Sequence, residues 1–276
     1  MSWEEWLLIP LGFVVGAYGT IVGAGGGFVL VPVLLLIYPD EDPAAVTSIS
    51  LAVVFFNALS GSFAYGRVGR IDYRSGLVFA VSALPSAIGG AYLVDLIPRQ
   101  VFAVMFGCIL IGIALYTMWS AGRTEVIRPP LHGRFIVRRV MPGAEEGATF
   151  QYSYNMLYGV ISSAVIGLLS SLLGIGGGVF QVPVMINLLR FPVHIATATS
   201  QFVLLFMSGE GSAVHLLHGH IAGDNLVRAL LLSAGVIPGA QLGARLSKRM
   251  RGALVARLLA AALIVVGGRL LLRVVW

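Results

Sequence analysis

Two glycine-rich runs carry the backbone groups most able to bind a ligand. Residues 23–32 read GAGGGFVLVP, and residues 174–183 read GIGGGVFQVP. Because glycine adopts backbone conformations that other residues avoid, each run predicts a break in the chain. A helix that restarts after such a break presents unpaired N–H groups and the positive end of its dipole, and both attract anions. We therefore expect substrate-binding glycines in both runs: Gly23, Gly25, Gly26, Gly27, Gly174, Gly176, Gly177 and Gly178.

The alternative interpretation is that each run forms a kink that lets two helices cross closely, without binding a ligand. A break that recurs at corresponding places in two halves of a membrane protein favours a transporter binding site instead. The runs are not dinucleotide-binding fingerprints, because Phe28 and Val179 stand where G-x-G-x-x-G requires its last glycine.

Polar side chains are concentrated in the apolar segments that follow the two runs. Hydroxyls and amides can donate hydrogen bonds to an oxyanion and leave the site neutral, although they also bond between helices in membranes. Thr47-Ser48 and Thr199-Ser200 look equivalent at the starts of these segments. The polar candidates for the substrate site are Ser48, Ser50, Asn57, Thr199, Ser200 and Gln201.

Glu210 is the carboxylate that the pattern places well inside an apolar segment. Ionisable groups inside a membrane are costly and are usually functional. Glu210 is therefore a candidate proton-coupling residue, because a buried carboxyl can take up and release a proton during a transport cycle. The alternative is a structural carboxyl that bonds to Ser208, Ser212 or a neighbouring helix.

We expect no metal site, no catalytic residue and no cofactor. His215, His218 and His220 cluster at the outer end of one segment, but only the first two share a helical face, and no clear carboxylate ligand accompanies them. They suit interfacial positions or a pH-sensitive gate better than a zinc site. The one cysteine, Cys108, excludes an internal disulfide and a cysteine metal cluster, and we expect it to be a buried small hydrophobe.

Composition places these residues in a polytopic membrane protein. The mean hydropathy is +0.92 and charged residues make up 11%, whereas a soluble domain has about 25%. Because a helix needs about 20 apolar residues to cross a bilayer, most of the apolar segments fit one crossing. The first and fifth are longer and are interrupted by the glycine runs, so each predicts two helices, arranged either as a re-entrant hairpin or as two crossings. The apolar segments are residues 6–37, 45–66, 76–94, 101–119, 153–189, 193–217, 226–246 and 253–275.

The net charge of +6 reports topology rather than nucleic-acid binding. Lys and Arg favour the cytoplasmic side of a membrane, and they gather in residues 66–75, 120–152 and 245–251, whereas the acidic loop at residues 40–42 has none. Placing the basic regions inside makes the first long segment start and end outside, and the fifth start and end inside. We therefore expect an all-α polytopic membrane protein with two inverted structural repeats, each with a glycine-broken segment followed by three transmembrane helices. The predicted divisions are an N-terminal repeat (1–119), a basic cytoplasmic linker (120–152) and a C-terminal repeat (153–276).

Small residues recur at helical spacing in the third helix of each half. Ridges of this kind let helix backbones approach closely in lipid, so we expect them to serve packing. The two sets are Ser82, Ser86 and Gly90, and Gly235, Gly239 and Gly243.

The paired G-x-GGG-(x)₄-P runs, the halves joined by a basic linker, and the Ala-rich segments around Pro85 and Pro238 resemble the TauE/SafE sulfite exporter family of anion permeases. The resemblance extends over about residues 8–273. It implies transport of sulfite, organosulfonates or related small oxyanions, with export as the direction that the family suggests. The matching positions are the glycines of both runs, with Thr47-Ser48 and Thr199-Ser200 as polar entries. Glu210 is not carried over by the resemblance.

The sequence thus predicts a secondary transporter in the bacterial inner membrane that moves a small anionic substrate by alternating access, with Glu210 as the candidate for proton coupling. The expected partners are the substrate and the lipid bilayer, without nucleic acid and without enzymatic activity. A passive anion channel on the same scaffold is the first alternative, and a membrane-embedded assembly or redox factor is the second. The oligomeric state, including a homo-oligomer, stays open.

Overall fold

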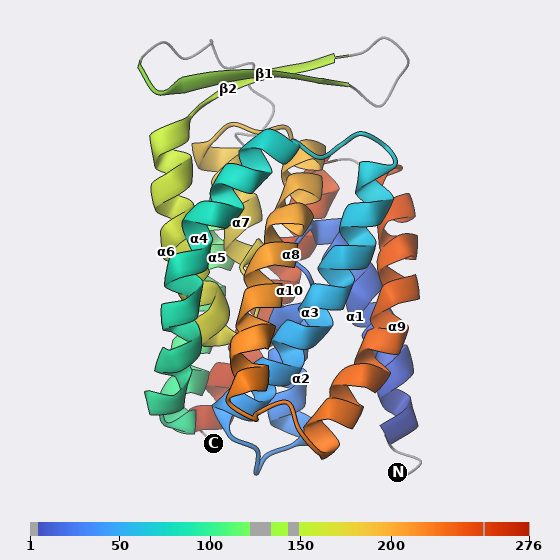
Figure 1. The fold of residues 1–276 in the computed structure, drawn as a ribbon, viewed down its shortest axis with the longest axis vertical. Coiled ribbons are helices and arrows are strands. Elements are labelled where there is room, and N and C mark those ends of the chain that lie inside the picture. The colour runs from blue at the N-terminus through green and yellow to red at the C-terminus, as the bar shows by residue number, and fades with distance from the viewer. Residues whose placement is uncertain (1–4, 122–133, 143–148, 251, 276) are drawn as a thin grey trace.

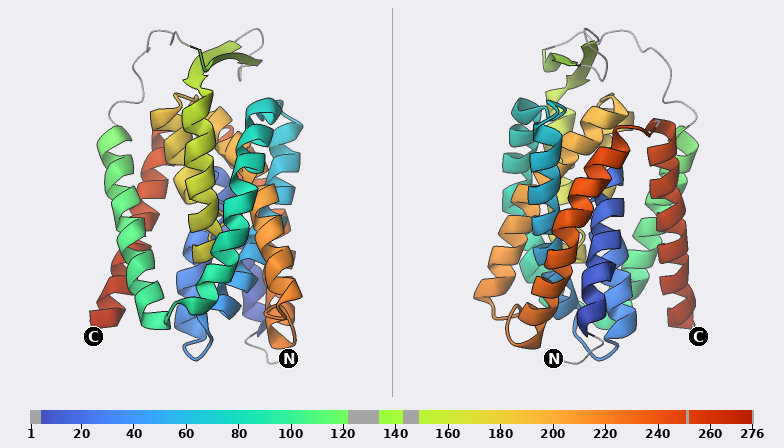
Figure 2. Two further views of the ribbon diagram at one scale, coloured as in Figure 1. Left: turned by 60° about the vertical axis from the view of Figure 1, so that its left-hand side comes forward. Right: turned by 90° about the vertical axis from the view of Figure 1, so that its right-hand side faces the viewer.

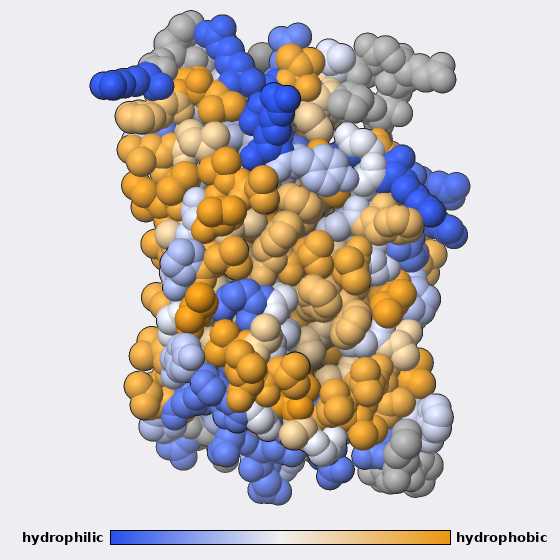
Figure 3. Space-filling model, viewed as in Figure 1, coloured by the Kyte–Doolittle hydropathy of each residue, from blue (hydrophilic) through white to orange (hydrophobic). Residues whose placement is uncertain are grey.

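The computed structural model describes residues 5–121, 134–142, 149–250 and 252–275 of the chain. It is a bundle of helices with a small antiparallel sheet across one end (Figure 1). Figure 3 shows apolar side chains over the middle of one face and hydrophilic side chains gathered at both ends. Five helices in the described ranges are long and apolar enough to cross a membrane: Glu5–Val22, Pro43–Gly66, Tyr73–Leu96, Met156–Leu173 and Asp224–Ser247. The predicted class, a polytopic α-helical membrane protein, is confirmed.

The helices follow the predicted apolar segments, and both long segments split at their glycine runs. The first half contains α1 (Leu8–Val22), α2 (Gly27–Ile37), α3 (Pro43–Gly66), α4 (Tyr73–Leu93) and α5 (Arg99–Ala121), with short 3-10 turns at Glu5–Leu7 and Val94–Leu96. The strands β1 (Ile136–Pro142) and β2 (Thr149–Asn155) follow. The second half contains α6 (Met156–Leu173), α7 (Gly178–Pro183), a π-helical turn (Val184–Leu188), α8 (Val193–Leu217), α9 (Asp224–Ser247) and α10 (Gly252–Val275).

The first long segment, α1 and α2, turns back on itself, so that its two ends lie at the end of the bundle opposite the strands (Figure 1). Glu5, just before α1, and Tyr38, just after α2, are close enough to interact. Burial raises the pKa of Tyr38, Arg228 opposes this shift, and the charge of Glu5 adds to it. Arg228 holds this end together, because its guanidinium stacks 3.9 Å above the Tyr38 ring and pairs with Glu41 at 2.6 Å. The α1–α2 segment is therefore a hairpin that enters from this opposite end.

The second long segment, α6 and α7, forms a hairpin that enters from the strand end, which is the end of the bundle where β1 and β2 lie (Figures 1 and 2). Tyr152 and Tyr154, just before α6, pack on Phe191, just after the π-helical turn, with ring centroids 4.5 and 5.0 Å apart. The beginning and the end of this segment are thus in contact at the strand end.

The first helix of each hairpin packs against a helix of the other half. Figures 1 and 2 show α9 beside α1 and α4 beside α6. Along α9, a Cβ at Gly235, Gly239 or Gly243 would overlap carbonyl oxygens of α1. Along α4, Gly90 lies equally close to the backbone of α6, and the Ser86 hydroxyl donates to the carbonyl of Ala164. The predicted packing role is confirmed for these five residues within one chain, whereas the Ser82 hydroxyl donates to Val78 inside α4.

The basic residues of the α3–α4 loop and of the turn after α9 lie at the strand end, whereas Arg228 lies at the opposite end. The connection between α3 and α4 and the turn after α9 both lie there, whereas the acidic loop at residues 40–42 lies at the opposite end (Figure 1). This separation agrees with the charge pattern, and the assignment of the strand end to the cytoplasm stays a prediction. The residues concerned are Arg67, Arg70, Arg74, Arg245, Lys248 and Arg249.

The predicted linker contains a β-hairpin that the sequence analysis did not foresee. Strands β1 and β2 pair antiparallel from Ile136↔Asn155 to Pro142↔Thr149. Helix α5 runs to Ala121 and β2 to Asn155, slightly beyond the predicted limits of 120–152. The rest of this linker, including Arg123, Arg128 and Pro129-Pro130, lies outside the described residues.

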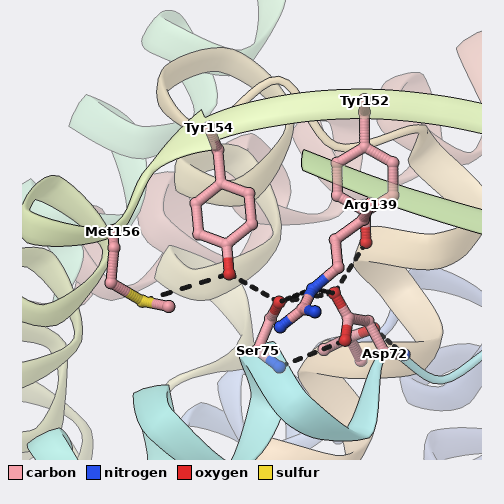
Figure 4. A network of polar contacts seen from close by, with 7 residues as sticks. Asp72, Ser75, Arg139, Tyr152, Tyr154 and Met156 are labelled. Carbon is pink, nitrogen blue, oxygen red and sulfur yellow. Dashed lines mark hydrogen bonds and ion pairs between the residues drawn. The ribbon is translucent and has the colours of Figure 1, made fainter. Parts of the chain in front are cut away.

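A polar network docks this β-hairpin onto the start of α4 (Figure 4). Asp72 caps α4 and accepts a hydrogen bond from the backbone N–H of Ser75 at 3.1 Å. The same carboxylate accepts from the hydroxyl of Tyr152 at 2.8 Å and pairs with Arg139 Nε at 3.3 Å. Tyr154 and the Ser75 hydroxyl share a further bond of 2.6 Å. Since Asp72 is buried, these partners compensate its charge and fix the sheet over the bundle.

We expect Tyr152→Phe to weaken this docking by about 1 kcal/mol at neutral pH, because Asp72 loses one donor. Burial, and after it the charge of Asp72, raises the pKa of Tyr152. A raised pKa in the folded state means that the stability from this phenol is complete below about pH 10 and is lost as the pH rises toward the folded-state value. Thermal unfolding between pH 7 and pH 11 should therefore show a smaller alkaline loss in the variant than in the wild type. The control is Tyr158→Phe on the exposed side of α6, and equal alkaline losses in wild type and Tyr152→Phe would contradict the prediction.

Cys108 lies exposed on α5, so the expectation of a buried position was wrong. An apolar segment indicates that a helix is immersed in the membrane, but not which of its faces contacts protein and which contacts lipid.

Candidate functional site

Both glycine runs form breaks with left-handed backbone, as predicted. Gly25 and Gly26 have φ values of 76° and 85°, and the equivalent Gly176 and Gly177 have 73° and 82°. Gly23 and Gly174 end α1 and α6 in the same conformation. Residues with a Cβ rarely adopt these angles, so the glycines are required here by the backbone itself. Their role in binding a substrate stays a prediction.

The two breaks pack directly against each other inside the bundle. A Cβ at Gly178 would lie 2.5 Å from the Cα of Ala24, and a Cβ at Gly27 would lie 2.8 Å from the Cα of Ile175. All residues from 23 to 27 and from 174 to 178 are buried. The tips of hairpins that enter from opposite ends therefore meet in a closed, buried contact.

The first backbone N–H groups of α2 and α7 at this contact have no backbone acceptor in the described ranges. At each break, one glycine carbonyl accepts from two backbone N–H groups of the helix that follows. Val29 and Leu30 donate to Gly26, and Phe180 and Gln181 donate to Gly177. Within the described ranges, no backbone carbonyl accepts from the N–H groups of Gly27, Phe28, Gly178 or Val179.

At the first break, the predicted polar residues donate to backbone carbonyls of α1. Asn57 Nδ2 donates to Gly16 at 3.3 Å, and Asn57 Oδ1 accepts from Thr20 Oγ1 at 2.6 Å. Gln201 Nε2 donates to Gly19 at 3.3 Å, and the Ser200 hydroxyl donates to Gly23 at 2.9 Å. These side-chain bonds attach the end of α1 to α3 and α8, and the carbonyl of Gly19 also accepts from the backbone N–H of Ala24 at 2.9 Å.

At the second break, by contrast, fully buried hydroxyls lack partners. Ser50, Ser170 and Ser171 are 0% exposed, and none of the three hydroxyls has a hydrogen-bond partner among the described residues. Ser170 packs beneath Gly177, and Ser171 Oγ lies beside Gly211 of α8. The sequence analysis named Ser50 but missed Ser170 and Ser171; their position just before the GIGGG run, separated from it by two leucines, was the available signal.

Contacts with the breaks also correct one pairing of the two halves. A Cβ at Gly174 would lie 2.7 Å from the Cα of Thr47, and a Cβ at Gly23 would lie 2.7 Å from the Cα of Thr197. Thr197, rather than Thr199, is therefore the counterpart of Thr47, and the predicted equivalence was wrong by two residues. The correct correspondence was missed because it depends on how α3 and α8 are rotated about their axes where they contact the breaks.

Two of the predicted site residues point elsewhere. The Ser48 hydroxyl donates to Ala45 at 2.7 Å, within its own helix. Thr199 Oγ1 accepts from the N–H of Asp72 at 3.0 Å and so belongs to the docking network of the strand end. The structure therefore brings Ser50, Asn57, Ser200 and Gln201 to the breaks, but not Ser48 or Thr199.

Glu210 lies in α8 without compensation for a negative charge. Both carboxylate oxygens are inaccessible and have no hydrogen-bond partner among the described residues. The Ser208 hydroxyl donates to Leu204, and the Ser212 hydroxyl is itself without a partner, so neither serine supports a structural carboxyl. An ionised carboxylate in such surroundings is costly, and the role of Glu210 in proton coupling stays a prediction.

The histidines at the opposite end pair differently from the prediction. The left-handed Gly219 (φ 78°) turns the chain back, so that His215 Nδ1 and His220 Nδ1 are 3.0 Å apart. Asp95 lies 3.8 Å from the other nitrogen of His220, whereas His218 packs on the ring of Tyr92. Among the described residues, no group of three or more His, Cys, Asp or Glu side chains is arranged to hold a metal ion.

Comparison with known proteins gives one consistent result. The family described as "Sulfite exporter TauE/SafE" matches residues 8–270. The chain is 34% identical to the "Probable membrane transporter protein YunE" of Bacillus subtilis, over 96% of each chain. It is 28% identical to the "Probable membrane transporter protein MJ0441" of Methanocaldococcus jannaschii, over 91% of this chain and 90% of that relative. No solved structure matches the chain.

The family match spans nearly the whole chain and includes both glycine breaks. The helices and apolar surface described above are those of a multi-pass membrane protein, consistent with a bacterial inner membrane. This chain therefore belongs to the TauE/SafE sulfite exporter family.

Proposed function

We propose that this protein is a secondary transporter of small sulfur-containing anions, such as sulfite or organosulfonates. The observation that carries the proposal is the buried contact of the two breaks, where backbone N–H groups and serine hydroxyls have no hydrogen-bond acceptor or donor within the described ranges. Family membership and the names of the relatives, "probable membrane transporter protein", support transport as the activity. Export is the direction that the family description favours.

The free groups suit an oxyanion because all of them are hydrogen-bond donors and none requires a fixed positive charge. Backbone N–H groups at helix starts bind anions together with the positive end of the helix dipole. The second break adds the hydroxyls of Ser50, Ser170 and Ser171, whereas the donors of the first break are already used on α1. We therefore place the substrate's oxygens nearer to the second break.

Alternating access is supported by the way the halves are assembled. The hairpins enter from opposite ends, and α9 holds α1 as α4 holds α6 (Figure 2). Inverted repeats of this kind allow one half to rock against the other around a fixed site. Because the breaks are buried, the structure corresponds to a closed state in which neither end reaches the site.

The proposed function is tested by flux into proteoliposomes that contain the purified protein. Sulfite and sulfoacetate should enter with saturable kinetics, and taurine, sulfate and chloride serve as competitors. A saturable flux of one sulfur anion supports a transporter, whereas a linear, non-saturating flux of all the anions indicates a passive channel. No flux of any sulfur oxyanion above protein-free liposomes would refute the proposal.

We expect the double variant Ser170→Ala, Ser171→Ala to bind the transported anion about 10-fold more weakly while melting at a higher temperature without ligand. A buried hydroxyl without a partner destabilises the empty protein, so its removal stabilises that state. The matched control is Ser200→Ala, which removes the bonded hydroxyl at the first break and should lower the melting temperature. Thermal shift with and without sulfite checks both effects. Unchanged affinity in the double variant would remove these serines from the site.

A further inference from the structure

Arg70 is a buried cation that forms no ion pair with any carboxylate of the described residues. It follows Gly69 in the α3–α4 loop, where its backbone N–H donates to the carbonyl of Tyr65 at 3.3 Å and folds the loop over the end of α3. The residue is 8% exposed, and Nη1 has no partner in the part of the chain that the structure describes. Two partly buried arginines are paired with carboxylates, since Arg139 meets Asp72 and Arg228 meets Glu41.

The described neighbours that interact with the charge of Arg70 are an imidazole and a phenol, and neither is a carboxylate. His194, at the start of α8, interacts with the charge of Arg70, and its own Nδ1 is buried without a partner in the described ranges. Burial lowers the pKa of Arg70, while its interaction with Tyr65 acts in the opposite direction. Arginine nevertheless stays protonated in proteins, so the charge persists and is left uncompensated.

The loop is connected to the paired breaks by one residue. The Tyr65 hydroxyl donates to the carbonyl of Thr20 at 2.8 Å, and the same carbonyl accepts from the N–H of Gly23, where α1 ends. An anion held by Arg70 would therefore lie at the strand end, next to the helix that leads to the first break.

A loop of the same shape at the opposite end shows what is unusual here. The N–H of His220 donates to the carbonyl of His215 at 3.0 Å, directly after the left-handed Gly219, just as Arg70 follows Gly69. His220, however, has His215 and Asp95 as partners for its ring nitrogens. At the equivalent position of the strand-end loop, Arg70 Nη1 has no partner among the described residues.

We propose that Arg70, with His194 beside it, forms a second anion site at the strand end, which binds the small sulfur oxyanion as it enters or leaves the transport path. The proposal rests on the proposed function, because it names the same substrate class. The planar guanidinium presents paired N–H donors that match two oxygens of an oxyanion, and a buried setting strengthens that interaction. A lipid phosphate has the same chemistry, and the experiment distinguishes the two sources.

The test compares Arg70→Gln with Arg67→Gln, which removes the same charge from the same loop. Arg67 is exposed and stacks on Phe63 at 4.2 Å. We expect Arg70→Gln to raise the melting temperature of the ligand-free protein and to raise the KM for sulfite flux about 10- to 100-fold, with kcat little changed. Arg67→Gln should leave both quantities as in the wild type, and Arg70→Lys should recover part of the affinity because it keeps the charge without the fork.

Each result separates the two proposals. Wild-type flux with an unchanged KM in Arg70→Gln overturns the second site and leaves the proposed function standing. Absent wild-type flux refutes the proposed function itself. Thermal shifts are measured in neutral detergent with sulfite, or with phosphatidylglycerol in its place. The proposal would be overturned if phosphatidylglycerol stabilises the wild type, sulfite does not, and the stabilisation by lipid disappears in Arg70→Gln. Arg70 would then be a lipid-binding residue.

Discussion

Gly178→Val is expected to reduce sulfite flux by about 100-fold while the protein still inserts into the membrane. Gly178 does not have a left-handed backbone, so the effect comes from contact rather than from backbone strain. A Cβ there would lie 2.5 Å from the Cα of Ala24 and 2.7 Å from the carbonyl oxygen of Gly23. Both are backbone atoms in a packed interior, so the two breaks must separate and the donors at the start of α7 must move away from the anion.

The matched control is Gly112→Val in α5, where an added Cβ meets nothing within 4 Å. It should keep wild-type flux and differ only slightly in stability. Should Gly178→Val fail to insert, Gly27→Ala approaches the same contact from the other hairpin, with its Cβ 2.8 Å from the Cα of Ile175. Wild-type affinity and flux in a well-inserted Gly178→Val protein would show that the anion binds elsewhere.

Glu210→Gln is expected to abolish accumulation driven by a pH gradient while exchange of anion across the membrane continues. The carboxylate oxygens of Glu210 have no described partner, so no fixed cation or donor holds the side chain in its charged form, and it is free to gain or lose a proton during the cycle. With one coupled proton, a gradient of one pH unit drives about tenfold accumulation, because one pH unit corresponds to about 1.36 kcal/mol. The amide cannot take up or release a proton in this range, so the variant should not accumulate the anion at all.

The measurement is sulfite uptake into proteoliposomes with and without an imposed pH gradient. Asp224→Asn, at the exposed start of α9, removes a carboxylate of similar charge and should preserve the gradient-driven component. Tenfold accumulation in Glu210→Gln would exclude Glu210 from proton coupling. If an imposed pH gradient does not change sulfite accumulation by the wild type, the protein moves its anion passively or with another ion.

Some of this architecture was predictable because it depends on neighbouring residues alone. Hydropathy over about 20 residues sets whether a helix can cross the membrane, and the predicted segments coincide with the helices. The left-handed backbone at Gly26 and Gly177 follows from the absence of a Cβ, and the ridge of Gly235, Gly239 and Gly243 follows from helical spacing.

Other features were missed because they require partners that are distant in the chain. The β-hairpin depends on Tyr152 reaching Asp72, and the polar linker carries no periodicity that reports this contact. His215 meets His220 rather than His218 because the chain reverses at Gly219. The exposure of Cys108 depends on which face of α5 the neighbouring helices cover.

The same division applies to the candidate site. The sequence by itself determined that two glycine breaks interrupt a membrane protein and that serines, amides and one carboxylate lie in the surrounding helices. Only the tertiary structure decided that the breaks touch, that Asn57 and Gln201 donate to α1, and that the hydroxyls of Ser170 and Ser171 and Arg70 Nη1 lack partners among the described residues. The reason is physical: backbone freedom and hydropathy belong to each residue and its neighbours, whereas the partner of a buried donor is set by how distant helices rotate and pack.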